Sequence, residues 1–208
     1  LGITDTEVSE LTQNRRFVEL FDSELISDAE SLAYTIGLLK AIRDHDLRFL
    51  LTFHNRVSKA KNFVSLLEEV NEALPVDETV PGLWTGHVSG SMASRERQQI
   101  MQRFRSGAQN VNLLSNARCL GEGVDIPDID GIGFIDPRKS TVDIVQAVGR
   151  AIRKSDHGTV GTIVIPVFIE QGTGQSDIEQ LNESRFKAIW DVLKALRAHD
   201  EVLAGELN

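Results

Sequence analysis

The sequence predicts an α/β fold in which helices cover both faces of a mostly parallel, doubly wound sheet. Short apolar or β-branched runs alternate along the chain with longer segments whose apolar residues recur at helical spacing. Strands and helices that alternate in this way imply parallel neighbours, because parallel strands need a crossover connection between them. The composition agrees, since 41% hydrophobic and 25% charged residues are ordinary proportions for a folded domain.

Five runs are predicted to be strands. The first contains the consecutive apolar residues Phe49, Leu50 and Leu51, which is typical of a strand buried on both faces. The last is rich in β-branched residues, whose side chains suit a pleated surface. The predicted strands are residues 48–54, 84–89, 111–115, 132–135 and 160–167.

Five further segments are predicted to be helices. Ser27 or Asp28 can cap the first, because short polar side chains accept hydrogen bonds from the free N–H groups of a first turn. Gly107 ends the third, because glycine readily adopts the left-handed conformation that terminates many helices. The predicted helices are residues 28–46, 57–73, 94–105, 141–153 and 176–199.

The length of 208 residues is enough for one sizeable core, so we expect one domain with helical extensions. The expected parts are an N-terminal extension with a linking helix at residues 1–46, an α/β lobe at 47–170 and a C-terminal accessory helix at 171–208. The chain opens with Leu1-Gly2-Ile3 and has neither a basic nor an apolar leader there. This opening indicates an internal fragment of a longer protein.

Two features bear on the compartment. The single cysteine, Cys119, cannot form a disulfide within the chain and favours a reducing compartment, so a cytoplasmic protein is expected. The longest apolar stretch, residues 163–169, is interrupted by Pro166 and is too short to span a bilayer. We therefore expect no role in a membrane.

The net charge of -9 is unusual for a protein that binds nucleic acid, because contacts to phosphates normally need a basic surface. The acidic charge is concentrated at the two ends. Residues 1–35 hold eight acids and two bases, and residues 176–208 hold seven acids and four bases. The middle of the chain is neutral, with sixteen of each, and can still carry a local basic strip.

In a doubly wound sheet, functional residues usually lie on the loops that follow the carboxyl ends of the strands. The loops in question are residues 54–56, 89–92, 115–125 and 136–139.

The most informative segment is residues 146–153, which read Gln-Ala-Val-Gly-Arg-Ala-Ile-Arg. On a helix, the polar residues and the glycine share one face, and an apolar stripe that includes Ile144, Val145 and Val148 lies opposite. Guanidinium groups are planar and always charged, so this face suits a phosphate in a neighbouring site. The alternative is a surface helix with two solvated arginines. A glycine in mid-helix, however, costs about 1 kcal/mol relative to alanine and calls for a reason.

A second segment, residues 114–127, runs from a strand into polar residues and then into Gly121-Glu-Gly123-Val-Asp125. The carboxylate could accept a hydrogen bond from a sugar hydroxyl. By itself the pattern is weak, and a purely structural turn is the stronger alternative. Its position before the 146–153 helix shifts the balance towards function.

Taken together and in order, these segments resemble the second RecA-like lobe of superfamily 2 helicases, in the DEAD/DEAH-type or restriction-enzyme-like branch. The resemblance covers roughly residues 46–168. Residues 49–56 resemble motif IV, 115–127 resemble motif V, and 146–153 resemble motif VI with its pattern Q-x-x-G-R-x-x-R. The function implied is that of a C-terminal motor lobe of an ATP-dependent helicase or translocase.

The resemblance also implies roles for individual residues. Arg150 and Arg153 would be arginine fingers that face the γ-phosphate of ATP. Gln146 would support that cluster or the nucleotide, and Gly149 would leave space for close approach. Gly123 and Asp125 would lie near the ribose or couple the nucleotide state to the track. The residues expected to face nucleic-acid phosphates are His54, Asn55, Arg56, Ser89, Gly90, Ser115 and Asn116.

The chain contains neither a G-x-x-x-x-G-K-[ST] phosphate loop nor a D-E-x-H-like strand that would hold a metal ion. ATP and Mg²⁺ would therefore be bound mainly by an N-terminal RecA-like lobe of the same polypeptide, and this chain alone is predicted to be inactive. The expected track is nucleic acid, with DNA favoured over RNA.

Two alternatives remain at this point. One is a non-catalytic interaction module that keeps the helicase-like fold. It would have little need to keep Gln146, Gly149, Arg150 and Arg153 on one face. The other is a dinucleotide-dependent enzyme, which is disfavoured because no G-x-G-x-x-G follows the first strand.

Overall fold

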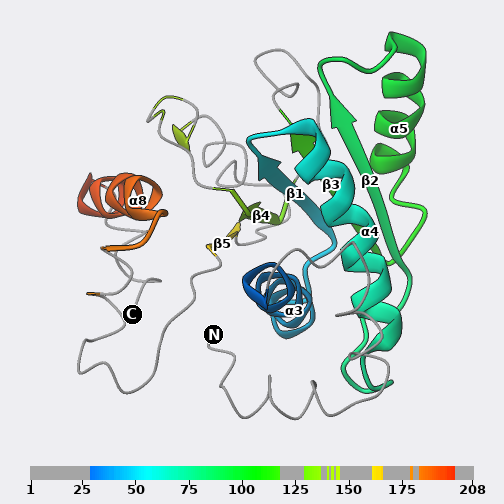
Figure 1. Ribbon diagram of the computed structural model, residues 1–208, viewed down its shortest axis with the longest axis horizontal. Coiled ribbons are helices and arrows are strands. Elements are labelled where there is room, and N and C mark those ends of the chain that lie inside the picture. Colours follow the sequence, from blue (N-terminus) through cyan, green and yellow to red (C-terminus); the bar gives the residue numbers. More distant parts are fainter. Residues whose placement is uncertain are drawn as a thin grey trace.

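A computed structural model describes residues 29–117, 129–136, 140, 142, 144–145, 161–165, 179 and 183–199. In chain order the elements are α3 (Ala29–Asp44), β1 (Phe49–His54), α4 (Val57–Ala73), β2 (Leu83–Ser89), α5 (Ser94–Ser106), β3 (Val111–Ala117), β4 (Gly131–Phe134), β5 (Thr162–Val164) and α8 (Lys187–His199). Helices and strands alternate from α3 to β3, as the sequence predicts, and β4, β5 and α8 follow in the described residues (Figure 1).

The strands form one sheet in the order β2-β3-β1-β4-β5, and each neighbouring pair is parallel. This confirms the predicted α/β class. The register aligns the ends of three strands, because His54 of β1 and Ser89 of β2 both pair with Ala117 of β3. Polar residues that follow these strands are therefore brought to one edge, which we call the carboxyl edge.

Helices cover both faces of the sheet, which makes it doubly wound. On one face, the apolar residues of α3 and α4 pack with Leu50 of β1 and Leu113 of β3. On the other face, α5 and α8 pack with Leu51, Phe53 and Leu114. Burying a side chain of this size stabilises a fold by about 1.5–3 kcal/mol, so these two clusters are the main source of stability.

Along β4, large apolar residues alternate with glycines, so that only one face of the strand carries side chains. Ile132 and Phe134 are fully buried on the α5/α8 face, whereas glycines take the positions that face α3. A Cβ atom at Gly131 would lie 2.9 Å from Cγ of Leu50, closer than side-chain atoms normally approach. The absence of side chains on this face of β4 lets the neighbouring apolar residues close over the strand.

Two helices end in the left-handed conformation at the opposite edge, which we call the amino edge. Helix α5 ends at Gly107, with φ of 55°, as the sequence predicts. Helix α3 ends at Asp46, with φ of 50°. There the Leu47 N–H donates to the Ile42 carbonyl at 3.0 Å, and the Asp46 N–H donates to the Arg43 carbonyl at 3.3 Å. This is a Schellman arrangement with aspartate at the position that usually holds glycine.

Two predictions of local structure need correction. The closing helix does not run unbroken from residue 176, because residues 184–186 form a turn and α8 begins at Lys187. The Ser184 hydroxyl accepts the Phe186 N–H at 3.2 Å and so caps a new helical segment, while Phe186 enters the core. The second correction is that Ile144 is buried as predicted but Val145 is 41% exposed. The apolar stripe of that helix is therefore narrower than predicted.

In the part of the chain that the structure describes, no helix is both long enough and apolar enough to cross a membrane.

Candidate functional site

The carboxyl edge brings together the described residues that the sequence singles out for nucleic-acid contact. His54 is the last residue of β1 and Ser89 is the last residue of β2. Ser115 and Asn116 lie near the C-terminal end of β3. The register pairs Asn116 with both Phe53 and Val88, so the three strands reach the edge side by side. Residues far apart in the sequence thus share one small region.

The structure divides these residues by accessibility. The side chains of His54, Ser89, Ser115 and Asn116 are buried. The Ser115 hydroxyl donates to the Ala60 carbonyl of α4 at 3.2 Å, which helps to dock that helix on the sheet. In contrast, Arg56 and Gly90 are exposed and Asn55 is half-buried. The accessible part of the group is therefore the turn at residues 55–56 together with Gly90.

At the centre of this edge lies Asp136, which follows β4. Its Oδ1 accepts a hydrogen bond from Lys59 Nζ at 2.8 Å, and its Oδ2 accepts one from the Asn55 N–H at 3.2 Å. His54 Nδ1 lies 3.7 Å from Oδ2, and His54 Nε2 lies 3.3 Å from the Thr52 hydroxyl. One buried carboxylate thus joins the end of β1 to the first turn of α4.

The Asp136 carboxyl is held in its charged form. Burial by itself opposes that charge, but the His54 ring, the Lys59 ammonium and the Asn55 N–H together outweigh it. These neighbours hold the pKa of Asp136 well below its ordinary value of 3.8. Carboxyl groups whose pKa is strongly shifted by burial and by a specific charged partner are concentrated at functional sites.

Sequence reasoning did not include Asp136 or Lys59 among the site residues. Asp136 begins one of the loops singled out at the carboxyl edge, so its position was a usable signal. Lys59 gave none, because its partner is 77 residues away in the sequence. Only the sheet order, which places β4 beside β1, brings the two together.

The remaining predicted site residues lie outside the described residues. These are Gly123, Asp125, Gln146, Gly149, Arg150 and Arg153. In the part of the chain that is described, no group of three or more His, Cys, Asp and Glu side chains is arranged to hold a metal ion.

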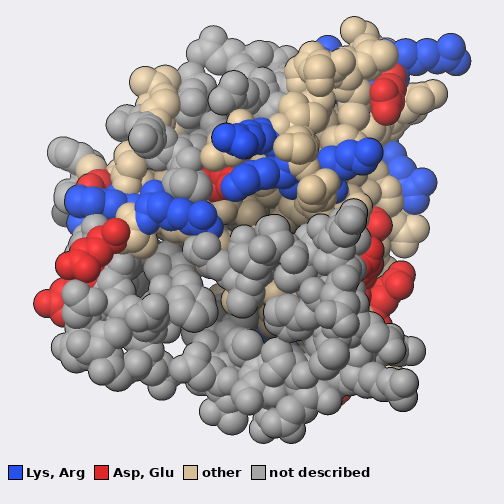
Figure 2. Space-filling model, in the orientation of Figure 1, with Lys and Arg blue, Asp and Glu red and all other residues tan. Residues whose placement is uncertain are grey.

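Basic side chains gather on one face despite the acidic net charge. Figure 2 shows Lys and Arg side chains in a band that crosses this face over α8 and the first turns of α4, with acidic side chains beside it. Near α4, burial and the Lys61 ammonium lower the pKa of His87 from its ordinary value of 6.5, against an opposing effect of Glu96. This side chain adds no charge to the band at neutral pH.

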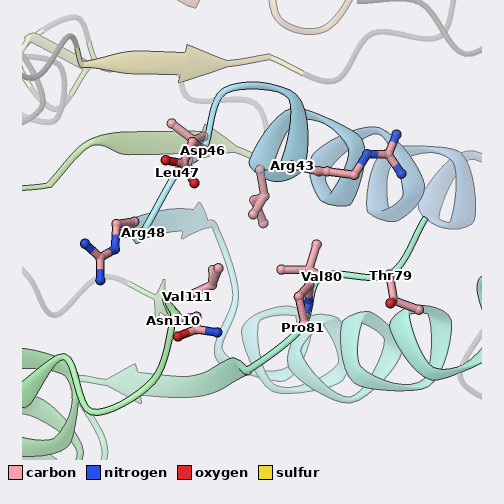
Figure 3. Close-up of a pocket in the computed structure, with 10 residues that line it drawn as sticks. Arg43, Asp46, Leu47, Arg48, Thr79, Val80, Pro81, Asn110 and Val111 are labelled. Carbon is pink, nitrogen blue, oxygen red and sulfur yellow. The ribbon is translucent and has the colours of Figure 1, made fainter. Parts of the chain in front are cut away.

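A hollow of about 380 Å³ lies at the amino edge, away from the residues described above (Figure 3). Its apolar floor includes Leu47, Val80 and Val111. The guanidinium groups of Arg43 and Arg48 lie on opposite sides of it, and Arg43 already donates to the Glu78 carbonyl at 3.2 Å. Because these charges do not converge, the hollow lacks the geometry of an anion site, and the carboxyl edge remains the candidate.

Comparison with known proteins defines the class, namely the C-terminal RecA-like lobe of superfamily 2 helicases. The family model for the "Helicase conserved C-terminal domain" matches residues 38–155. The chain belongs to this family. The match confirms the predicted relationship. It begins within α3, includes β1 to β4 and the segment that contains Arg150 and Arg153, and ends before β5.

Individual relatives support the same assignment. The Fanconi anemia group M protein homolog of Mus musculus is 32% identical over 156 residues, which are 72% of this chain and 7% of that protein. The putative ATP-dependent helicase IRC3 of Saccharomyces cerevisiae is 32% identical over 110 residues, which are 47% of this chain and 15% of that protein. The chain therefore spans only a small part of the length of these relatives.

Among solved structures, the ATP-dependent Type ISP restriction-modification enzyme LlaBIII bound to DNA superposes with a TM-score of 0.72 at 29% identity. The match covers 93% of this chain and 13% of that one. T4 UvsW covers 94% of this chain and 37% of its own, with a TM-score of 0.51 at 14% identity, and shares the fold.

Proposed function

We propose that this chain is the C-terminal motor lobe of an ATP-dependent nucleic-acid helicase or translocase. The observation that carries the proposal is the carboxyl edge, where the exposed turn at residues 55–56 is anchored to the buried Asp136 carboxylate in a chain of the helicase C-terminal family. Sheets of this kind bind ligands at their carboxyl edge.

The nucleic-acid backbone would be contacted by the accessible residues of this edge. Arg56 offers a cation, and the backbone at Gly90 is exposed and carries no side chain to obstruct a phosphate. The buried residues His54, Ser89, Ser115 and Asn116 would shape the edge rather than meet the phosphates through their side chains. Contacts of this type position a track without reading its sequence. DNA is the favoured track, because the 29% identical restriction enzyme is bound to DNA.

The nucleotide site would be shared with an N-terminal RecA-like lobe. In this arrangement Arg150 and Arg153 stabilise charge on the transferred phosphoryl group, and Gln146 and Gly149 support them. Gly123 and Asp125 lie towards the ribose. ATP with Mg²⁺ supplies the phosphoryl chemistry and is held mainly by the other lobe. Residues 47–170 would form the motor lobe, with residues 1–46 and 171–208 as its helical extensions.

The test is the ATPase rate of a polypeptide that contains this chain together with its N-terminal lobe, with and without duplex DNA, single-stranded DNA and RNA. We expect nucleic acid to stimulate hydrolysis, DNA more than RNA, and the chain alone to show no turnover. A two-lobe protein that neither hydrolyses ATP nor binds nucleic acid would favour the non-catalytic interaction module instead.

A further inference from the structure

Asp136 makes contacts on both sides of the turn that leads from β1 into α4. Its own N–H donates to the Phe53 carbonyl at 3.3 Å, which continues the pairing of β4 with β1. Its carboxylate then accepts the Asn55 N–H at 3.2 Å and the Lys59 ammonium at 2.8 Å. The turn at residues 55–56 is therefore held at its start by the main chain of β4 and at its end by one side chain.

Among the described residues, the start of α4 lacks the usual local features that would fix this turn. Arg56 occupies the N-cap position of α4 but makes no side-chain capping hydrogen bond, and the first turn of α4 contains no acidic residue. The side-chain oxygen of Asn55 is buried without a hydrogen-bond partner among the described residues. A helix start without its usual cap is weakly determined by its own sequence. Its geometry depends on the carboxylate that arrives from β4.

We infer that Asp136 is a positioning residue for the track-contacting turn, and that through the Asn55 N–H and Lys59 it sets where Arg56 meets a nucleic-acid phosphate. This inference rests on the proposed function. It deepens that proposal because it assigns part of the track affinity to a buried residue that does not touch the track.

The inference predicts an effect opposite in sign to that of simple electrostatics. Replacing Asp136 by asparagine removes a negative charge and frees Lys59, so charge alone predicts tighter binding of nucleic acid. Loss of positioning predicts weaker binding, because a misplaced contact forfeits its hydrogen-bond geometry. The sign of the change therefore distinguishes the two roles.

Asp130 is a matched control at the other end of the same strand. Its carboxylate accepts the Arg48 N–H at 2.8 Å and the Phe49 N–H at 2.9 Å, so it also fixes the backbone of β1. It lies at the amino edge, where no contact with the track is proposed. A substitution there removes a carboxylate that also holds the backbone next to β1, but it leaves the turn at residues 55–56 undisturbed.

The experiment uses the two-lobe protein and measures two quantities, namely the DNA concentration that gives half-maximal ATPase stimulation and the KM for ATP. For Asp136→Asn we expect the half-maximal DNA concentration to rise by about tenfold, which corresponds to about 1.4 kcal/mol, with little change in the KM for ATP. Lys59→Met, which keeps the Asn55 contact, should show a smaller rise. Asp130→Asn should leave both quantities unchanged.

Unchanged or tighter DNA binding by a folded Asp136→Asn variant overturns the inference, and so does an equal loss in Asp130→Asn. A wild-type protein that DNA does not stimulate overturns the proposed function, and the inference falls with it. A stimulated wild type with an unaffected Asp136→Asn variant overturns the inference alone.

Discussion

The two edges of the sheet use the same chemical group in different ways. Asp130 and Asp136 flank β4, and each carboxylate accepts backbone N–H groups of the segment that contains β1. At the amino edge Asp130 meets main-chain donors, and burial raises its pKa above the ordinary value against the opposing hydrogen bonds from Arg48 and Phe49. At the carboxyl edge the cation of Lys59 and the His54 ring join the main chain, and the pKa of Asp136 falls.

The difference agrees with the proposal that the carboxyl edge serves function and the amino edge serves stability. At the amino edge, Asp130 holds the start of β1 through main-chain hydrogen bonds, and two helices end nearby in the left-handed conformation. The carboxyl edge carries a charged network that includes Lys59, whose side chain is 49% exposed. Paired charges cost desolvation that apolar residues would avoid, and the buried charge of Asp136 agrees with the role proposed for the carboxyl edge.

The largest expected effect concerns Arg150 and Arg153, the two arginines proposed to face the γ-phosphate of ATP. Arg150→Ala and Arg153→Ala should each lower ATP turnover in the two-lobe protein far more than they weaken ATP binding. The turnover rate should fall by a factor of up to about 10³–10⁵. Lysine should restore little, because it lacks the planar fork. Arg43→Ala, at the amino edge, is the control and should retain the turnover. Near-normal stimulated turnover in both folded alanine variants would mean that these side chains are only solvated.

The next effect is on stability and its dependence on pH. The folded pKa of Asp136 is depressed, so its contribution is present above the ordinary value of 3.8 and is lost as pH falls through that value towards the folded pKa. Asp136→Asn should reduce the free energy of unfolding by about 1–3 kcal/mol at pH 7, discounted for the exposure of Lys59. Urea titrations at pH 7, 5 and 3 should show the deficit shrinking as the pH falls.

Asp130 should show the opposite trend. Its folded pKa is raised, so its favourable contribution is complete below the ordinary pKa of 3.8 and declines as pH rises through the folded pKa. The stability difference between wild type and Asp130→Asn should therefore be largest at low pH. Parallel pH profiles for the two variants would show that the edges do not differ electrostatically.

One glycine at each edge tests whether stability and nucleic-acid binding depend on different edges of the sheet. Gly107, with φ of 55°, lies where a Cβ would come within 2.7 Å of the Phe49 ring, so Gly107→Ala should cost about 1–3 kcal/mol of stability. A Cβ at Gly90, on the carboxyl edge, would have no heavy atom within 4 Å. Gly90→Ala should change stability by less than about 0.5 kcal/mol. Thermal unfolding and DNA titration of both variants would show whether loss of stability and loss of binding separate as expected.

The smallest effect concerns the end of α3. Asp46 holds a left-handed conformation that glycine adopts without strain, so Asp46→Gly should stabilise the protein by about 0.5–1 kcal/mol. Asp46→Val should destabilise it, because a β-branched side chain is poorly tolerated there. Neither change should alter ATPase stimulation, and urea unfolding with an activity assay would check both statements. A loss of stability in Asp46→Gly would indicate that the aspartate side chain contributes more than its strain costs.

The sequence by itself determined the class of fold and most element boundaries. Helix α4 has the predicted bounds, and α5 ends at the predicted glycine, because helical and strand periods and left-handed helix ends are local properties of the chain. The helicase relationship was also available, since it depends on the order of short motifs. The roles of Arg150, Arg153, Gln146, Gly149, Gly123 and Asp125 remain predictions.

Tertiary structure alone decided which of the polar residues predicted at the site are buried and which side chains meet there. The strand order β2-β3-β1-β4-β5 places Asp136 beside Asn55 and Lys59, and it buries His54 and Asn116, which the sequence had grouped with accessible residues. The break before α8 is a further case, because the core that receives Phe186 is built from distant strands. Burial and pairing depend on neighbours that are remote in sequence, and no local period encodes them.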